Sequence, residues 1–521
     1  MTKGTFGIVE GFFSLPLPPW SHRQRGETIR FVSRNAAHVN CYFYCPKNDR
    51  LVTERWASRY GARDMHELRA LTSRCRKHGI ETIYGLNPLL ESLDPTDPRS
   101  KARWLRAVAA KLDHVLELGF EGVCLLFDDI PIAYDVADNA PLVLTPGERM
   151  MIDLVNEIYA RFRGRVTKFW FCGPDYCFRR ATPLTRELQS LHPEIGVIWT
   201  GNEIFVKTIA SRDLSRIQRL LGKDREILFW LNYPVNDCEQ GVGSFNLGAI
   251  PSLPHDVLAR LGAFLVNPMR ECYSNLPVYL SLSELAKSPQ RYRRVDAWQR
   301  SLQTLFGVRA VSAQLIADNF GTRNIVDDGP PPLLKKLRRG SSVAPVIEEV
   351  RNALGEIRRE GLGRDAVRFR GAIEQVLKNA EWFVEIADAV LADRPISLSR
   401  LRKNDWFPTS LTQARYAPEI VRILSQRLEA LGDFGRRTAL NKRDIAEIRA
   451  FGKRYAGQQK LALGRREGAR ILKVVRTLVR CEQEAVCEFL NDTSRPAVER
   501  VRGYLARNAC SRFSLPSRAF Q

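Results

Sequence analysis

The first 270 residues alternate short apolar runs, rich in β-branched and aromatic side chains, with longer stretches that have the periodicity of amphipathic helices. The eight strand candidates are residues 5–10, 40–45, 81–86, 122–127, 168–172, 196–200, 227–231 and 263–266. Strands that alternate with helices form parallel sheets, because each parallel pair needs a crossover connection. Eight such units match a (β/α)8 TIM barrel, which typically needs about 250 residues.

Helix start signals support this alternation. Asp97-Pro98 and Thr182-Pro183 each place a capping residue before a first-turn proline. Residues 145–148 (TPGE) have the spacing of a capping box. An open doubly wound sheet is the alternative, but no glycine-rich phosphate-binding motif follows the first strand.

Beyond Arg270 the strand patterns end, and apolar residues recur at three- and four-residue spacing. Helices are therefore predicted at residues 296–305, 345–358, 370–391, 417–431 and 442–451. We predict two domains, a barrel over residues 1–302 followed by an all-α helical bundle over residues 303–521. Residues 326–342 (VDDGPPPLLKKLRRGSS) are expected to be an exposed loop or linker, because consecutive prolines cannot continue a helix and the charges that follow are well solvated.

The net charge of +22 is unevenly distributed. Residues 1–300 have 40 Lys and Arg against 33 Asp and Glu, a net charge of +7, whereas residues 301–521 have 40 against 25, a net charge of +15. A basic C-terminal region favours polyanions or anionic surfaces as partners. The alternative is that these charges only solvate the helix faces.

The remaining composition predicts a cytoplasmic, cofactor-free globular protein. No run approaches the roughly 18 uncharged apolar residues that span a bilayer, and the N-terminal apolar run is broken by Glu10, unlike a secretory signal. The 11 cysteines are scattered, several of them in strand-like runs, as reduced buried thiols are. Because the chain has neither a CxxC motif nor clustered histidines, no metal site is expected.

Polar residues follow every predicted strand. In a (β/α)8 barrel the carboxyl ends of the strands meet at one face, where the active site lies. The residues at these ends are Glu10, Gly11, Lys47, Asn48, Asp49, Asn87, Asp128, Asp129, Asp175, Tyr176, Thr200, Asn202, Trp230, Asn232, Asp237 and Asn267. Hydroxyls, amides and carboxylates among aromatic rings are the lining expected for a sugar. Any single one could instead be an ordinary turn residue.

Asp128 and Asp129 end the most apolar of these strands, in the run GVCLLFDDI. Such a pair could be a turn with a helix cap, a Mg²⁺ site or a catalytic pair. Two carboxylates at the end of a dry strand are costly unless they are used. The polar groups at all eight strand ends favour a function for the pair.

Seven runs occur in order at the strand ends, 7-GIVEGFF-13, 45-CPKND-49, 124-CLLFDDI-130, 171-FCGPDYC-177, 198-IWTGN-202, 230-WLNYPVND-237 and 265-LVNPM-269. As a set they resemble the catalytic domain of glycoside hydrolase family 84, the retaining β-N-acetylglucosaminidases. The resemblance covers roughly the first 300 residues.

The resemblance implies substrate-assisted catalysis, in which the acetamido carbonyl of the substrate attacks its own anomeric carbon and forms an oxazoline. Asp128 would then accept the acetamido N–H and stabilise the positive charge of the oxazoline. Asp129 would protonate the leaving oxygen and afterwards activate water. The charge of Asp128 and the apolar strand behind the pair would both help Asp129 to keep its proton.

The other matching positions are implied to bind the sugar. The backbone of Gly11 and the side chain of Lys47 would hold the 3-hydroxyl, and Asp237 and Asn267 the 4- and 6-hydroxyls. The residues implied to enclose the acetamido group are Tyr176, Thr200, Trp230 and Asn232. Cys172 either lines the pocket for the acetyl methyl group or is a buried structural thiol.

Two stretches depart from the family's pattern. Leu231 stands where the family usually has Asp, and residues 15–19 (LPLPP) resemble an insertion. Because Leu231 follows Trp230 on a strand, its side chain is expected to point away from the pocket.

The resemblance thus predicts an exo-β-N-acetylglucosaminidase that acts on terminal β-linked, O-GlcNAc-like sugars of a glycoconjugate or glycoprotein. One alternative is hyaluronidase-like cleavage of an acidic, GlcNAc-containing polysaccharide. Another is a polyanion- or partner-binding role for the basic helices, above all residues 435–480, although aromatic residues are sparse there and no nucleic-acid motif occurs. A homo-oligomer formed through the helical region is also possible.

Overall fold

The computed structural model describes residues 4–12, 19–89, 93–94, 97–128, 134–135, 140–141, 146–178, 181, 183–206, 208–237, 245–321, 330–402 and 483–509. The chain divides into two compact units. One consists of Met1–Val235 with Ala249–Ala297, and the other of Asn236–Gly248 with Trp298–Gln521. The separation into domains at residue 302 stays a prediction.

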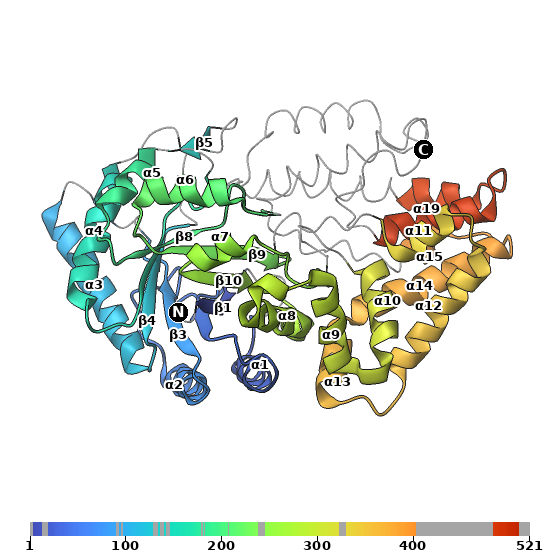
Figure 1. The fold of residues 1–521 in the computed structure, drawn as a ribbon, viewed down its shortest axis with the longest axis horizontal. Helices are drawn as coiled ribbons and strands as arrows, with labels where there is room; N and C mark the ends of the chain where they lie inside the picture. The colour runs from blue at the N-terminus through green and yellow to red at the C-terminus, as the bar shows by residue number, and fades with distance from the viewer. Residues whose placement is uncertain are drawn as a thin grey trace. The chain divides into compact units, whose positions relative to one another are not determined.

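The first unit is built on a closed barrel of eight parallel strands (Figure 1). The strands are β1 (Thr5–Glu10), β2 (Cys41–Tyr44), β3 (Glu81–Leu86), β4 (Gly122–Leu126), β7 (Phe169–Cys172), β8 (Gly196–Trp199), β9 (Ile227–Pro234) and β10 (Ala263–Asn267). Their order around the barrel is β1-β10-β9-β8-β7-β4-β3-β2. All eight predicted strands and the (β/α)8 fold are therefore confirmed.

Helices connect the strands on the outside of the barrel. They are α1 (His22–Asn35), α2 (Ala62–Lys77), α3 (Pro98–Glu117), α4 (Pro146–Phe162), α5 (Pro183–Glu187), α6 (Ser211–Leu221), α7 (His255–Arg260) and α8 (Leu276–Lys287). The side chain of Asp97 accepts hydrogen bonds from the backbone N–H groups of Arg99 and Ser100, so the predicted cap of α3 is confirmed. Strands β5 (Tyr134–Asp135) and β6 (Ala140–Pro141) form a small antiparallel pair between β4 and α4.

Every second residue of the barrel strands points inward, and these side chains form one dry core. They are Val9, Cys41, Phe43, Cys45, Ile83, Cys124, Leu126, Trp170, Cys172, Ile198, Leu228, Trp230, Ala263 and Leu265. Because the side-chain period is two, residues that continue this set past the carboxyl ends of the strands also point toward the barrel axis.

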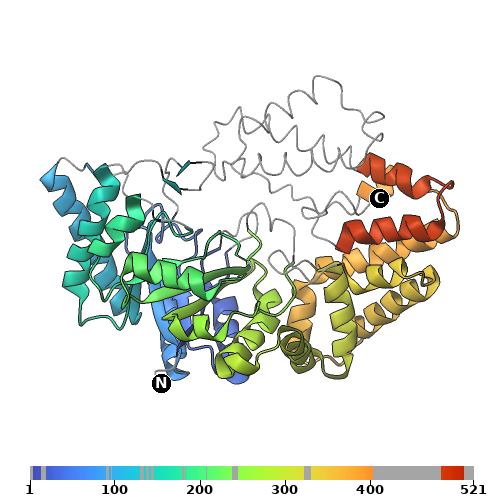
Figure 2. The ribbon, with the colours of Figure 1, turned by 45° about the horizontal axis from the view of Figure 1, so that its top comes forward.

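The second unit is helical in its described part. Its helices are α10 (Ala310–Phe320), α11 (Pro332–Arg338), α12 (Val343–Arg358), α13 (Arg364–Ala372), α14 (Glu374–Leu391), α15 (Leu398–Arg402) and α19 (Ala497–Ala509), and α9 (Arg294–Phe306) leads into it from the barrel unit. Helices α12 and α14 lie side by side in both ribbon views (Figures 1 and 2). The helices predicted at 296–305, 345–358 and 370–391 are confirmed, the last with a break at Ile373. Those predicted at 417–431 and 442–451 lie outside the described residues.

The loop predicted over residues 326–342 is wrong for part of its length. Helix α11 begins at Pro332, where the missing N–H and fixed φ of proline suit a first turn. Leu333, Leu334 and Leu337 are buried, and the Leu333 N–H donates to the Asn319 side chain at 2.9 Å. The basic residues between these leucines made the amphipathic pattern of this short helix hard to recognise in the sequence.

None of the helices in the described ranges is both long and apolar enough to cross a membrane.

Candidate active site

Five of the predicted site residues each lie two residues past an inward-pointing core residue of their strand. Gly11 lies two residues past Val9, Lys47 two past Cys45, and Asp128 two past Leu126. Asn232 and Asn267 likewise lie two residues past core members of β9 and β10. The barrel therefore brings these side chains to the same end of its axis, the end formed by the carboxyl termini of its strands.

Lys47 and Asp128 form an ion pair at this end. The distance from Lys47 Nζ to Asp128 Oδ2 is 2.6 Å, and the two side chains are only 3% and 13% exposed. Shielding from water strengthens the attraction within such a pair relative to one on the surface, and the neighbouring Lys47 ammonium group favours the ionised form of the carboxylate. The site therefore contains a fixed negative charge with a cationic partner.

Gly11 packs directly against the indole of Trp230. A Cβ atom at position 11 would lie 2.2 Å from Cζ2 and 2.4 Å from Cη2 of Trp230, so no larger residue fits without displacement of the ring. Trp230 is 5% exposed and packs edge-to-face on Phe43, with ring centroids 5.8 Å apart. The glycine therefore lets β1 approach the aromatic wall of the site.

Asn232 is the centre of an amide cluster beside this wall. Its Oδ1 accepts hydrogen bonds from Trp230 Nε1 at 2.9 Å and from Asn267 Nδ2 at 3.1 Å. Its Nδ2 donates to the carbonyl of Ile204 at 2.9 Å. Asn267 Oδ1 is buried without a hydrogen-bond partner among the described residues, so it can accept a hydrogen bond from a ligand.

Thr200 and Tyr176 are held together by their backbones. The Thr200 N–H donates to the Tyr176 carbonyl at 2.9 Å, and the Thr200 hydroxyl also donates to that carbonyl, at 3.4 Å. Tyr176 packs against the dry barrel core, and Cys172 is a buried member of that core. These contacts join the segment after β8, which holds Thr200, to the segment after β7, which holds Tyr176.

Leu231 points away from this group. Its neighbour Trp230 is in the inward set, and Leu231 itself is fully buried on the opposite face of β9. The departure from the family's pattern at this position therefore affects packing outside the barrel core rather than the lining of the site.

Two predicted site residues are not placed with the rest. Asp129 lies outside the described residues. Asp237 follows β9 by three residues and is half-buried, but it belongs to the segment grouped with the helical unit. Residues 15–19 include positions outside the described part, so the effect of that stretch stays a prediction.

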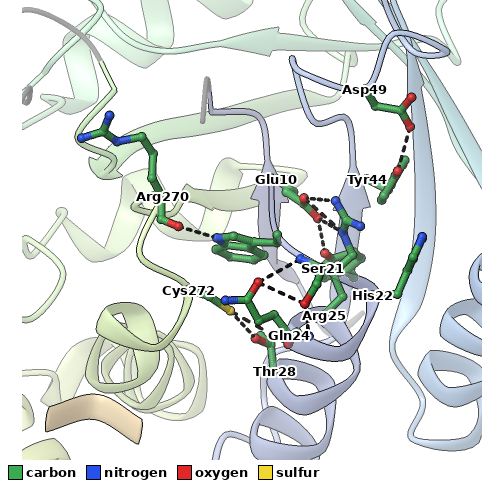
Figure 3. A network of polar contacts seen from close by, with 12 residues as sticks. Glu10, Ser21, His22, Gln24, Arg25, Thr28, Tyr44, Asp49, Arg270 and Cys272 are labelled. Atoms are coloured by element: carbon green, nitrogen blue, oxygen red, sulfur yellow. Dashed lines mark hydrogen bonds and ion pairs between the residues drawn. The ribbon is translucent and has the colours of Figure 1, made fainter. Parts of the chain in front are cut away.

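Glu10, which the sequence pattern groups with the polar strand ends, points in the opposite direction. It is completely buried between β1 and α1, where Arg25 Nη2 donates to Glu10 Oε1 at 2.6 Å and Arg25 Nε to Oε2 at 2.8 Å (Figure 3). Tyr42 OH donates to Oε2 at 2.5 Å. Burial alone would lower the pKa of Arg25, but the charge of Glu10 raises it well above its usual value. Glu10 is therefore part of a structural ion pair.

Asn87 is a residue of the site region that the sequence prediction left out of the binding set. It lies two residues past Gly85 on β3, the strand between those that carry Lys47 and Asp128. Its Oδ1 is buried without a hydrogen-bond partner in the described part of the chain. Strand alternation was the signal that could have identified it.

No group of metal ligands is present in the described ranges, where no three His, Cys, Asp or Glu side chains are arranged to hold an ion. Burial raises the pKa of the Cys75 thiol to about 12 and raises that of Cys124 well above its usual value, so these two thiols stay protonated near neutral pH. The described polar groups at this end of the barrel are carboxylates, amides, hydroxyls and one lysine.

Comparison with known proteins assigns the class. A sequence model of the β-N-acetylglucosaminidase family matches residues 6–318, more than half of the chain and all eight barrel strands. The chain therefore belongs to this family of glycoside hydrolases, family 84, as its strand-end motifs suggested.

The relatives include protein O-GlcNAcase of Rattus norvegicus and of Mus musculus, each 28% identical over 323 residues. The match covers 61% of this chain and 33% of each relative, so the chain spans about a third of their length. A solved mutant of the Thermobaculum terrenum O-GlcNAc hydrolase shares the fold at a TM-score of 0.61, with 19% identity over 92% of this chain and 96% of that chain.

Proposed function

We propose that this protein is a retaining exo-β-N-acetylglucosaminidase that hydrolyses terminal β-linked GlcNAc with assistance from the substrate's own acetamido group. The observation that carries the proposal is the shielded pair of Lys47 and Asp128 at the carboxyl end of the barrel, with an amide and indole wall opposite. The same residues stand in the family's motifs, and family membership supports the reaction class.

In the proposed mechanism Asp128 remains ionised throughout. It accepts a hydrogen bond from the acetamido N–H, turns the acetamido carbonyl toward the anomeric carbon, and stabilises the positive charge that develops as the oxazoline forms. Lys47 keeps Asp128 charged and in place, at an Nζ–Oδ2 distance of 2.6 Å. Asp129 donates a proton to the leaving oxygen and then removes one from the attacking water. Two inversions at the anomeric carbon leave the β configuration unchanged.

The proposed pocket recognises the sugar by its polar substituents. Trp230 provides an apolar wall, while Tyr176, Thr200 and Asn232 enclose the acetamido group. The unpartnered Oδ1 of Asn267 is suited to accept a hydrogen bond from a sugar hydroxyl. The carbohydrate is proposed to be carried by a protein, since the curated relatives are named as protein O-GlcNAcases. Buried free thiols in the described ranges agree with action in the reducing cytoplasm.

The proposal is tested with an aryl β-GlcNAc and its β-glucoside analogue. Wild type should hydrolyse the aryl β-GlcNAc, and it should hydrolyse the β-glucoside at least about 10³-fold more slowly, because the glucoside lacks the intramolecular nucleophile. Asp129→Asn should lower kcat/KM by roughly 10²- to 10⁴-fold. Proton NMR of the first-formed sugar should show the β anomer.

Two outcomes would refute parts of the proposal. Absence of hydrolysis by folded wild type between about pH 5 and 8 would remove the enzymatic function. Cleavage of both glycosides at similar rates would leave a hydrolase but exclude assistance by the acetamido group.

A further inference from the structure

The turn that carries Lys47 is fixed from outside the barrel. Lys47 and Asn48 are the two central residues of a tight turn that follows β2, closed by a 3.0 Å hydrogen bond from the Asp49 N–H to the Pro46 carbonyl. Lys47 reaches Asp128 from this turn. The position of the Lys47 ammonium group therefore depends on what holds the two ends of the turn.

Asp49 ties one end of this turn to the sheet and to the next connection. Its Oδ2 accepts hydrogen bonds from Tyr44 OH at 2.8 Å and from Tyr60 OH at 2.7 Å. Its Oδ1 accepts the N–H of Leu51 at 2.9 Å, which starts the turn structure of residues 50–57. Three donors converge on one carboxylate, and each is worth more than a neutral hydrogen bond because the acceptor is charged.

The two tyrosines are themselves held by buried neighbours. Tyr44 stacks on Tyr84 with centroids 5.9 Å apart, and the Arg25 guanidinium lies 5.1 Å above the Tyr44 ring (Figure 3). Burial, and then the charge of Asp49, raise the pKa of Tyr44 well above its usual value, so its hydroxyl stays a donor.

Tyr60 is anchored by groups from α3. Its backbone N–H donates to His114 Nε2 at 3.1 Å, and its hydroxyl lies 2.9 Å from Tyr84 OH. Lys111 Nζ lies 4.4 Å from the Tyr60 ring centroid and donates to the Ser58 carbonyl at 2.8 Å. The anchor of Asp49 thus extends into the layer between the sheet and its helices, where motion is restricted by close packing.

We propose that Asp49 is a positioning residue for Lys47: held by Tyr44 and Tyr60, it fixes the turn that brings the lysine to Asp128. Asp49 itself contacts neither Lys47 nor Asp128 in any described hydrogen bond or ion pair, so it acts through the backbone of the turn. The consequence for catalysis rests on the proposed function, because Asp128 acts there only when its charge partner is in place. The effect on Lys47 itself does not depend on that function.

The first test is the reactivity of the Lys47 amine, followed by limited acetylation and peptide mass spectrometry. In wild type the shielded, ion-paired amine should react slowly. Asp49→Asn keeps the size of the side chain but replaces one acceptor oxygen by a donor, so it should raise the labelling rate of Lys47 by at least about fivefold through local opening. Lys101, which is about one-third exposed, is the internal reference and should not change.

A matched control is Glu54→Gln, the same chemical change on an exposed carboxylate of the same turn region that pairs only with Arg50 in the described contacts. It should leave Lys47 labelling unchanged. Tyr60→Phe removes one donor to Asp49 while it keeps the ring, and should give a smaller rise; it replaces Asp49→Asn if that variant does not fold. Unchanged Lys47 labelling in the folded variants, or an equal rise in Glu54→Gln, would overturn the proposal.

The second test is a double-mutant cycle on the hydrolysis of an aryl β-GlcNAc. Asp49→Asn should lower kcat/KM by roughly 10- to 100-fold in wild type, since small misplacements of catalytic groups are costly. In a Lys47→Met background it should change kcat/KM by less than about twofold, because the group it positions is gone. Equal losses in both backgrounds would refute action through Lys47. If wild type lacks activity, the proposed function fails, and the labelling result alone decides the role of Asp49.

Discussion

The two ends of the barrel each hold a lysine paired with a carboxylate, but the surroundings of the two pairs differ. At the amino end, Lys168 Nζ lies 3.2 Å from Glu81 Oε2, and the side chains are 21% and 24% exposed. At the carboxyl end, the pair of Lys47 and Asp128 is closer and more shielded. The chemical pair alone therefore does not define a site.

The partners of each pair show what distinguishes the ends. Lys168 also donates to Thr5 Oγ1 at 2.5 Å and its Nζ lies 5.4 Å from the Trp170 ring centroid, so it has three partners at the amino end. The carboxyl end instead has buried acceptor oxygens, in Asn87 and Asn267, that find no partner among the described residues. At the amino end, protein groups provide the partners of the lysine, and these contacts stabilise the barrel. At the carboxyl end, buried acceptor oxygens without a described protein partner are suited to accept hydrogen bonds from a ligand.

The largest expected difference between the ends is in catalysis. Asp128→Asn should lower kcat/KM for an aryl β-GlcNAc by roughly 10²- to 10³-fold, because it removes the charge that is proposed to stabilise the oxazoline. Glu81→Gln removes the matching charge at the amino end and should leave kcat/KM within about twofold. Parallel steady-state kinetics on both variants measure the contrast.

A similar loss of activity in both variants, with both still folded, would contradict this separation of roles. Unfolding midpoints in urea distinguish a catalytic loss from a loss of structure. Glu81→Gln is expected to shift its midpoint slightly downward, since it weakens the interactions of Lys168 and of Thr167, whose hydroxyl donates to Glu81 at 2.5 Å.

A smaller contrast is expected from glycines at the two ends. Gly11→Ala places a methyl group 2.2 Å from the indole of Trp230, and Gly196→Ala places one 2.7 Å from Glu226 Oε2 and 2.8 Å from Trp170 Cδ1. Each should reduce the free energy of unfolding by about 1–3 kcal/mol through overpacking. Only Gly11→Ala should also lower kcat/KM, by roughly 10-fold or more, because the displaced ring belongs to the site.

The measurement compares kcat/KM with the free energy of unfolding for the two glycine variants. If Gly196→Ala loses as much activity as Gly11→Ala at the same stability, the indole has no special role at the carboxyl end. A variant that is inactive at a temperature where it is fully folded identifies a local effect on the site.

The barrel could be predicted because it depends on local patterns, whereas the candidate site residues were predicted from their place at the strand ends and from the resemblance to family 84. Strands of four to eight residues alternate with helices, and Asp97 before Pro98 is a start signal that needs no tertiary information. Once the inward face of a strand is known, the period of two places Lys47 and Asp128 at one end of the barrel. Position in the alternation thus supports the grouping of these two residues, while their roles stay predictions.

The contacts between distant residues could not be predicted from the sequence. Glu10 resembles a site carboxylate until Arg25 and Tyr42 meet it behind the sheet, and nothing local signals these partners. Asp49 likewise resembles a turn residue until Tyr60 reaches it from the next connection. In α11 the charge run was visible in the sequence, while the surface that buries Leu333 and its neighbours was not.

The smallest predicted effect concerns the second carboxylate at the amino end. Burial raises the pKa of Glu226, only partly opposed by Lys168, so the folded state holds a proton on Glu226 at pH values where the unfolded chain has released it. Stability from this group is therefore present below its ordinary pKa of 4.5 and is lost as the pH rises through its higher pKa in the folded state.

Glu226→Gln should abolish this pH-dependent loss of stability. It should raise the thermal midpoint slightly near neutral pH relative to wild type and leave it nearly unchanged at pH values below 4.5. The measurement is the difference in midpoint between the two proteins across this range, with activity at the carboxyl end as the control that should stay constant. A lower midpoint for Glu226→Gln at neutral pH would mean that the ionised carboxylate stabilises Lys168, and that the amino end needs both of its acids.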